Sequence, residues 1–137
     1  MNRLDFQALA QEKIAEAKIL LDAGKWTGAY CLAGYAVECG IKACIAKLFR
    51  TDVFPEKSFS DKCYIHDIDK LVQLAELKTA RDADCAANPT LDGNWATVVQ
   101  WTEASRYDRK TQQDAQDLEE AITNLPDGVF PWVQARW

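Results

Sequence analysis

The sequence predicts an all-α protein: an up-and-down bundle of four to five helices with a short C-terminal aromatic tail, forming one domain over residues 1–137. Three observations lead to this fold class. Apolar residues recur at three- and four-residue steps in several segments, the spacing that places side chains on one face of a helix. No segment shows the alternating pattern of a half-buried strand. The link between the first two helical segments is short, which favours antiparallel neighbours.

The segment from Trp26 to Phe49 is predicted to be the central helix. One of its faces carries large apolar residues, and a second face carries the small residues Ala29, Ala36, Gly40 and Ala43. A helix that is apolar or small around most of its circumference belongs inside a bundle, with neighbours on several sides. Its polar seam consists of Tyr35, Glu38 and Lys42.

The segments before and after this helix alternate between helix and loop. An apolar stripe predicts a first helix over Leu4–Ala23, which ends at Gly24, a residue typical of helix C-termini. The range Thr51–Ile65 contains Pro55 and alternating charges, and is predicted to be a long loop. A third helix is expected to begin near His66 or Asp67.

The last third of the chain predicts two more helices and a tail. Residues 78–89 are charged and then rich in Ala, and are interpreted as a ragged helix end plus loop. A fourth helix containing Trp95 is expected to end near residues 105–107. Thr111 and Asp114 resemble a capping box, which predicts the start of a fifth helix whose buried face includes Leu125. Residues 129–137 form the aromatic tail, which is expected to fold back.

Composition excludes several classes of protein. The net charge of −5 argues against binding nucleic acid mainly through a basic surface. The five cysteines are odd in number and lack Cys-x-x-Cys spacing, so we expect no disulfide framework, no metal site and a reducing compartment. The longest uncharged run, Trp26–Val37, is shorter than the roughly 20 residues of a membrane span. A cytoplasmic protein without a membrane segment or a cofactor is therefore predicted.

One polar cluster is the candidate ligand-binding site: Glu38, Lys42, His66, Arg106 and Tyr107. His66 is the chain's one histidine, and is either an acid/base or nucleotide contact or a helix-capping residue. Glu38 lies in the most apolar helix, where a carboxylate needs a partner. Three donors are available to Glu38: Lys42 four residues later on the same helix, Arg106 at the end of the fourth helix, and His66 at the start of the third.

Together these segments resemble the HEPN family (higher eukaryotes and prokaryotes nucleotide-binding domain). The resemblance spans roughly Ala17 to Leu125, and its motifs are Leu20-Leu21-Asp22-Ala23-Gly24-Lys25-Trp26, Gly34-Tyr35-Ala36-Val37-Glu38-Cys39-Gly40-Ile41-Lys42-Ala43, His66-Asp67-Ile68 and Trp101 through Tyr107. The resemblance implies a bundle of four or five helices that forms a homodimer with a cleft between the protomers. Many members are ribonucleases of toxin–antitoxin, phage-defence or RNA-processing systems, and others accompany a nucleotidyltransferase or bind nucleotides.

The ribonuclease signature of that family, an Arg followed four to six residues later by His, is absent after Arg106 and Arg109. We therefore expect a non-catalytic or divergent HEPN-like protein of a defence or toxin–antitoxin-type system. It would act through dimerisation and the binding of a nucleotide, RNA or a protein such as a toxin or nucleotidyltransferase. One alternative is a divergent metal-independent ribonuclease that uses Glu38, His66 and Arg106. The other is an acidic immunity or antitoxin-type inhibitor of a basic toxin.

Overall fold

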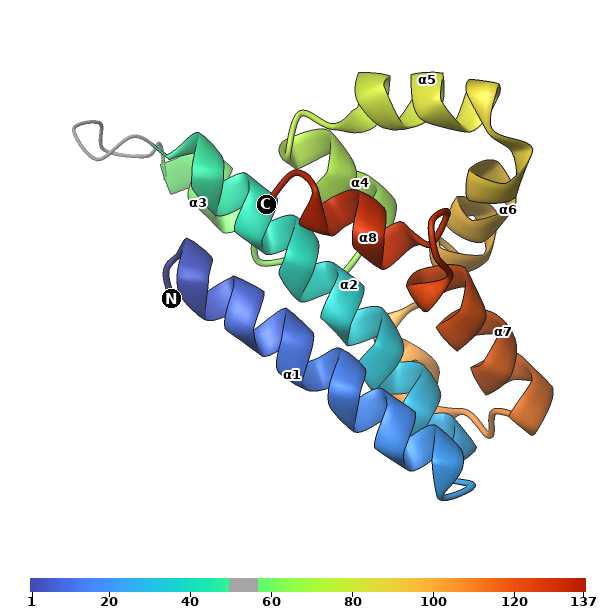
Figure 1. Ribbon diagram of the computed structural model, residues 1–137. Helices are drawn as coiled ribbons and strands as arrows, with labels where there is room; N and C mark the ends of the chain where they lie inside the picture. The colour runs from blue at the N-terminus through green and yellow to red at the C-terminus, as the bar shows by residue number, and fades with distance from the viewer. Residues whose placement is uncertain (50–56) are drawn as a thin grey trace.

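The computed structural model describes residues 1–49 and 57–137, and over these ranges the chain is helical without strands. The all-α class is therefore confirmed (Figure 1). The elements are α1 (Arg3–Asp22), α2 (Trp26–Leu48), α3 (Lys57–Lys62), α4 (Ile68–Leu74), α5 (Lys78–Ala87), α6 (Pro89–Val98), the 3-10 helix η1 (Glu103–Tyr107), α7 (Gln112–Thr123) and α8 (Val129–Gln134). Within the described ranges the helices are more numerous than the four to five expected, while α1 and α2 have nearly the predicted bounds.

Helices α1 and α2 form the predicted antiparallel hairpin (Figure 1). A capping box between Asn2 and Asp5 begins α1, because each residue's side chain accepts a hydrogen bond from the other's backbone N–H. Gly24 follows α1 with a φ of 76°, a left-handed conformation that glycine adopts without a steric penalty. The chain then turns back within two residues into α2.

Helix α2 is the centre of the fold, and packs against α1, α4, η1, α7 and α8. Its small-residue face is buried as predicted, with Ala36 and Ala43 fully enclosed. Gly34 lies against the ring of Trp101, and Gly40 against Val133 of α8. The length and composition of α2 would also suit a membrane span, but 67% of its most apolar 18-residue window is buried inside the domain. Helix α2 is therefore packed on several sides, as the core helix of a bundle is.

Three expectations for the middle of the chain are wrong. Residues 57–62 of the predicted loop form α3, while residues 50–56 lie outside the described ranges. The segment interpreted as a ragged end is the ten-residue helix α5. Pro89, interpreted as part of a loop, is instead the first residue of α6, with Asn88 as the N-cap that accepts a hydrogen bond from Leu91 N at 3.2 Å. Proline suits this position because the first helical N–H needs no intrahelical partner.

The predicted fourth helix is also shorter than expected. It ends at Val98, and the chain turns to place Trp101 in the core before η1 begins. The predicted capping box of Thr111 and Asp114 is confirmed at the start of α7. Leu125, expected on the buried face of that helix, lies beyond its end and is exposed.

The aromatic tail folds back as helix α8 and crosses α2 (Figure 1). Phe130 and Trp132 are buried, and Trp132 packs edge-on against Trp95 of α6 with ring centroids 5.5 Å apart. A guanidinium nitrogen of Arg3 donates to the carbonyl of Trp137 at 2.9 Å, so the two ends of the described chain meet. The chain itself buries Trp101, Phe130 and Trp132 and partly buries Trp137, and these aromatic residues therefore give no argument for a second copy.

Candidate functional site

Glu38 is a carboxylate in the core, with a relative exposure of 1%. It sits in the middle of α2, where an isolated charge would be strongly unfavourable. Lys42, one turn later, places its Nζ 2.8 Å from Glu38 Oε1. His66 places its Nδ1 3.0 Å from Oε1 and 3.1 Å from Oε2. The carboxylate is thus held by a cation on its own helix and by an imidazole from another part of the chain.

His66 lies just before α4, and its ring connects two carboxylates. Its Nε2 is 3.2 Å from Oε2 of Glu103, at the start of η1. The helix-capping interpretation of His66 is wrong, because Asp67 is the N-cap of α4 and accepts a hydrogen bond from Lys70 N at 3.0 Å. Capping by Asp67 leaves the His66 ring free to link α2 and η1.

Arg106 joins the same group of side chains from its exposed side. Its guanidinium lies 3.4 Å from Oε1 of Glu103 and 4.9 Å from the ring centroid of Tyr107. Glu38 pairs with Lys42 and His66. The alternative of a direct pair between Arg106 and Glu38 is therefore wrong. We call the connected side chains Lys42, Glu38, His66, Glu103 and Arg106 the His66 network.

The geometry of the His66 network constrains what its imidazole can do. Each ring nitrogen faces a carboxylate oxygen, so a doubly protonated ring would donate to Glu38 and to Glu103 together. A neutral ring donates to only one of them. In either form, the ring has no nitrogen directed at an open position where a substrate proton could lie. The arrangement is therefore better suited to binding or to holding helices together than to proton abstraction.

Tyr35 completes the polar seam of α2. Burial raises the pKa of its hydroxyl to about 12, because the charged phenolate would be poorly solvated there. Tyr35 is consequently neutral at physiological pH and available for hydrogen bonding only. The seam thus combines one buried ion pair with a neutral hydroxyl.

Of the predicted site residues, Glu38, Lys42, His66 and Arg106 lie in one network, and Tyr107 lies beside it. Glu103 was missing from the predicted cluster, although it bridges His66 and Arg106. Its spacing of three residues before Arg106 was a usable signal, because residues three apart face the same side of a helix. That spacing also occurs on many solvated helix surfaces and so does not mark a site by itself.

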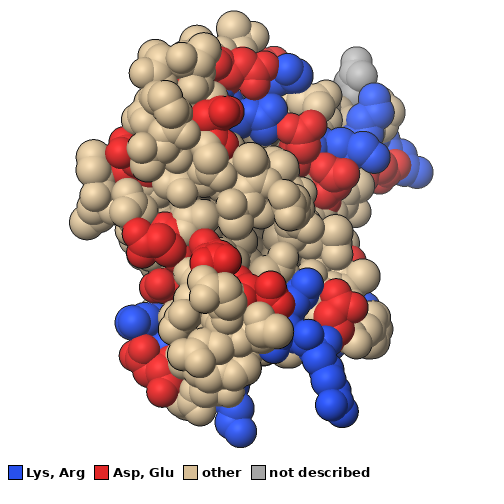
Figure 2. Space-filling view, turned by 90° about the vertical axis from the view of Figure 1, so that its right-hand side faces the viewer, with Lys and Arg blue, Asp and Glu red and all other residues tan. Residues whose placement is uncertain are grey.

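Charged side chains of both signs share the surface of this protein. Figure 2 shows one face on which acidic groups lie beside basic ones, without a continuous basic area across that face. Among residues 1–49 and 57–137, no group of His, Cys, Asp or Glu is arranged to hold a metal ion. No match to the chain was found among protein-family models, curated proteins or solved structures.

Proposed function

We propose that this chain is a HEPN-like helical protein of a defence or toxin–antitoxin-type system that binds RNA or a nucleotide without cleaving it. The observation that carries the proposal is the His66 network, which brings together side chains from three separate segments of the resemblance. The four- to five-helix bundle of that family would correspond to α1, α2, α4, α6 and α7, with α8 as the aromatic tail. The resemblance is also the basis for proposing a defence role in the cytoplasm.

Arg106 and Tyr107 form the accessible part of the proposed binding site. Tyr107 is 79% exposed, and the guanidinium of Arg106 lies over its ring. An exposed aromatic ring offers a stacking surface for a base, and a guanidinium pairs with phosphate in a forked geometry. Glu103 holds Arg106 from the other side, which restricts the orientations of the guanidinium. These two side chains thus offer two kinds of contact that proteins use to bind single-stranded RNA, base stacking and phosphate pairing.

The His66 network favours binding over cleavage. Hydrolysis through the ribose 2′-OH requires a base next to that hydroxyl and an acid next to the leaving oxygen. Both nitrogens of His66 already face carboxylates, and the sequence has no second histidine. Glu38 is buried and ion-paired, so it is not placed to meet a substrate. We infer that the network orients Arg106 and stabilises the fold.

RNA binding is tested by fluorescence anisotropy with a labelled single-stranded oligoadenylate. Tyr107→Ala is expected to weaken binding about fivefold or more, because base stacking on an aromatic ring contributes ~1–3 kcal/mol. Arg106→Ala should weaken it as well and reduce its dependence on salt. Lys18→Ala, which removes an exposed cation from α1, is the matched control. Equal affinity in all four proteins would place any RNA site elsewhere, and no binding of the oligoadenylate would leave a nucleotide or a protein as the remaining ligand.

We also propose that the protein is a homodimer, which places two copies of the exposed Arg106–Tyr107 pair in one assembly. The family resemblance also suggests a toxin or a nucleotidyltransferase as a protein partner. Multi-angle light scattering over a wide concentration range tests the dimer. A monomer mass that does not change with concentration would contradict this part of the proposal.

A divergent ribonuclease is the second candidate, because Glu38 and His66 are in direct contact and Arg106 is connected to His66 through Glu103. Cleavage of RNA by purified protein that disappears in His66→Ala would support it. The absence of cleavage in the parent protein would favour the binding function. An acidic inhibitor of a basic toxin has only the net charge of −5 in its favour.

A further inference from the structure

The two ring nitrogens of His66 connect α2 to η1. Nδ1 lies 3.0 Å and 3.1 Å from the two carboxylate oxygens of Glu38. Nε2 lies 3.2 Å from Oε2 of Glu103, the first residue of η1. A ring with two protons donates to both carboxylates, and a ring with one proton donates to only one of them. The number of protons on His66 therefore decides whether the connection is complete.

The two carboxylates differ in their freedom to respond when the ring loses a proton. Glu38 is 1% exposed and is also held by Lys42, so the core fixes its position. The side chain of Glu103 is 43% exposed and can turn towards solvent or another cation. A ring with one proton is expected to keep it on Nδ1, because an unsatisfied buried acceptor costs more than an exposed one. Nε2 then faces Glu103 with a lone pair, and that contact is lost.

The response of Glu103 reaches Arg106. Within the described part of the chain, the cationic partners of Glu103 are His66 and Arg106, whose guanidinium lies 3.4 Å from Oε1. A ring with two protons takes up part of the carboxylate's charge, while Glu103 stays beside Arg106 and orients it. Without that contact, Glu103 turns to Arg106 alone, and a phosphate must compete with it for the guanidinium. Loss of the proton also removes a positive charge from this part of the surface.

A change of charge in this network near neutral pH can be assigned to one side chain. His66 is the chain's one histidine, and histidine is the side chain that ordinarily changes its charge between about pH 5 and 8. The charged groups that face or adjoin its ring come from three elements: Glu38 and Lys42 of α2, Glu103 and Arg106 of η1, and Asp67 and Asp69 at the start of α4. Carboxylates, lysines and arginines ordinarily keep their charge across this range.

We propose that His66 is a proton-dependent switch on Arg106, which makes the binding of RNA at Arg106 and Tyr107 stronger under mildly acidic conditions. With two protons, the ring joins Glu38 to Glu103 and leaves the guanidinium of Arg106 available to phosphate. With one proton, Glu103 pairs with Arg106 and weakens its contact with RNA. The effect on RNA rests on the proposed function, whereas the turn of Glu103 is a property of the protein alone.

Fluorescence anisotropy with a labelled oligouridylate at about pH 5.5, 6.5 and 7.5 tests the effect on RNA, because this range spans the ordinary titration of histidine. Uracil bases neither gain nor lose a proton there, so the RNA itself does not change. At a constant ionic strength of about 0.15 M, the parent protein is expected to bind about two- to fivefold more tightly at the acidic end, the range for an exposed charge contact. His66→Gln keeps a hydrogen-bonding side chain that does not titrate, and its binding should not depend on pH.

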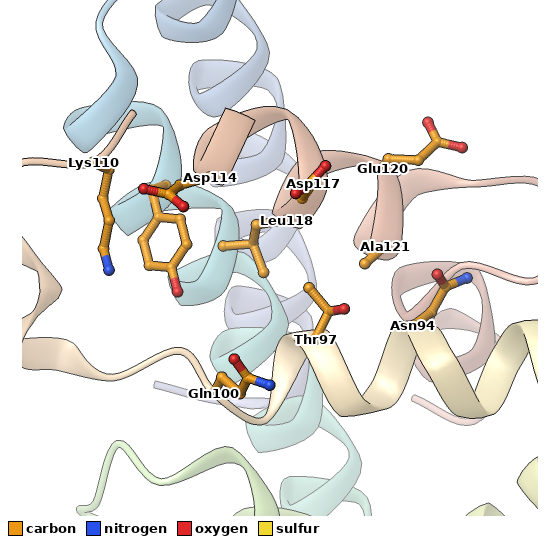
Figure 3. A pocket seen from close by; sticks show the side chains of 10 residues that line it. Asn94, Thr97, Gln100, Lys110, Asp114, Asp117, Leu118, Glu120 and Ala121 are labelled. Atoms are coloured by element: carbon orange, nitrogen blue, oxygen red, sulfur yellow. The ribbon is translucent and has the colours of Figure 1, made fainter. Parts of the chain in front are cut away.

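Two carboxylate variants separate the switch from a general effect of charge. Glu103→Gln removes the competitor of phosphate, so it should bind RNA more tightly than the parent at neutral pH and depend less on pH. Asp117→Asn removes the same charge elsewhere, because Asp117 lies on α7 and lines a separate cleft between α6 and α7 (Figure 3). This matched control should keep the pH dependence of the parent. Circular dichroism checks that each variant is folded.

A second measurement follows the switch without RNA. Amide signals of η1 in proton–nitrogen correlation spectra are expected to shift over the same pH range, because the contact between Glu103 and the ring changes with its protons. The same signals should not shift in His66→Gln.

Tighter binding under acidic conditions in the parent and in Asp117→Asn, but not in His66→Gln, supports the proposal. RNA binding by the parent that does not depend on pH, or an equal dependence in His66→Gln, would overturn the switch and leave the proposed function standing. If no protein binds RNA, the proposed function is contradicted instead, and the η1 signals decide the switch alone. Signals that shift only when His66 is present support it, and signals that do not shift overturn it.

Discussion

A buried carboxylate is stable only when donors surround it, and two side chains supply donors to Glu38. Lys42 supplies an ammonium group from the same helix, and His66 supplies a ring nitrogen from the segment before α4. Removing one partner leaves the charge in place with fewer donors, which costs more than an absent hydrogen bond at the surface. The stability of the domain should therefore depend on Lys42, although Lys42 is a polar residue and not part of the apolar core.

We predict that Lys42→Met destabilises the protein by about 1–3 kcal/mol, the cost of leaving a buried acceptor short of a donor. Adding Glu38→Gln should recover part of that loss, because the neutral amide is less costly to bury. Urea unfolding of both single variants and the double variant measures the coupling. Arg106→Ala serves as the comparison: Arg106 is exposed and pairs with half-exposed Glu103, so its loss should cost under about 1 kcal/mol. Strictly additive effects of Lys42→Met and Glu38→Gln would show that the pair does not stabilise the fold.

The buried thiols of α2 should make the folded protein less stable at alkaline pH. Burial raises the pKa of Cys39 and of Cys44 to about 11, from an ordinary value of 9.0. Because the folded pKa is raised, this contribution is complete below about pH 9 and is lost as pH rises towards 11, where the unfolded chain releases these protons first. We predict that the free energy of unfolding falls between pH 9 and 11, and less steeply in Cys39→Ala/Cys44→Ala. Chemical denaturation at pH 8, 9 and 10 tests this, and parallel curves would contradict it.

At the scale of helices, the contact between α2 and the segment after α6 depends on a glycine, Gly34, whose lack of a side chain leaves room for Trp101. A Cβ atom at Gly34 would overlap the ring of Trp101, which is buried in the core. We predict that Gly34→Ala destabilises the domain by about 1–3 kcal/mol through overpacking, despite the better helix propensity of alanine. Thermal melting monitored by circular dichroism measures the change. Gly93→Ala is the control, because Gly93 lies within α6 and has open space around it, and this variant should be neutral or stabilising.

The long helices were predictable because their apolar periodicity extends over many turns, whereas α5 was not. Helix α5 buries Arg81, whose guanidinium lies over the Trp95 ring at 5.3 Å and pairs with Asp69 at 2.7 Å. The apolar face of α5 consists of small residues and includes the charged side chain of Arg81, so its signal in the sequence is weaker than that of the long helices. The end of α6 was missed for a different reason: Trp101 leaves the helical path to reach Gly34, a tertiary contact that local sequence does not encode.

At the scale of the whole molecule, the sequence showed which residues of the candidate site need a partner, but not every partner they find. Glu38 required a donor, and the nearest donor, Lys42, was correctly identified. Which distant donor would join it depended on how α4 and η1 pack on α2, and that packing selected His66 rather than Arg106.

The central position of α2 also determines how the protein can fluctuate. Helix α2 packs against α1, α4, η1, α7 and α8, so its amides can be exposed only when most of the domain opens. Helix α5 packs mainly against α6, so we expect it to open at a lower free energy than α2. Native-state hydrogen exchange should therefore show α2 amides exchanging with the free energy of global unfolding, and α5 amides exchanging through local opening that urea hardly accelerates. The helix that holds Glu38 would then be the last part of the molecule to lose its structure.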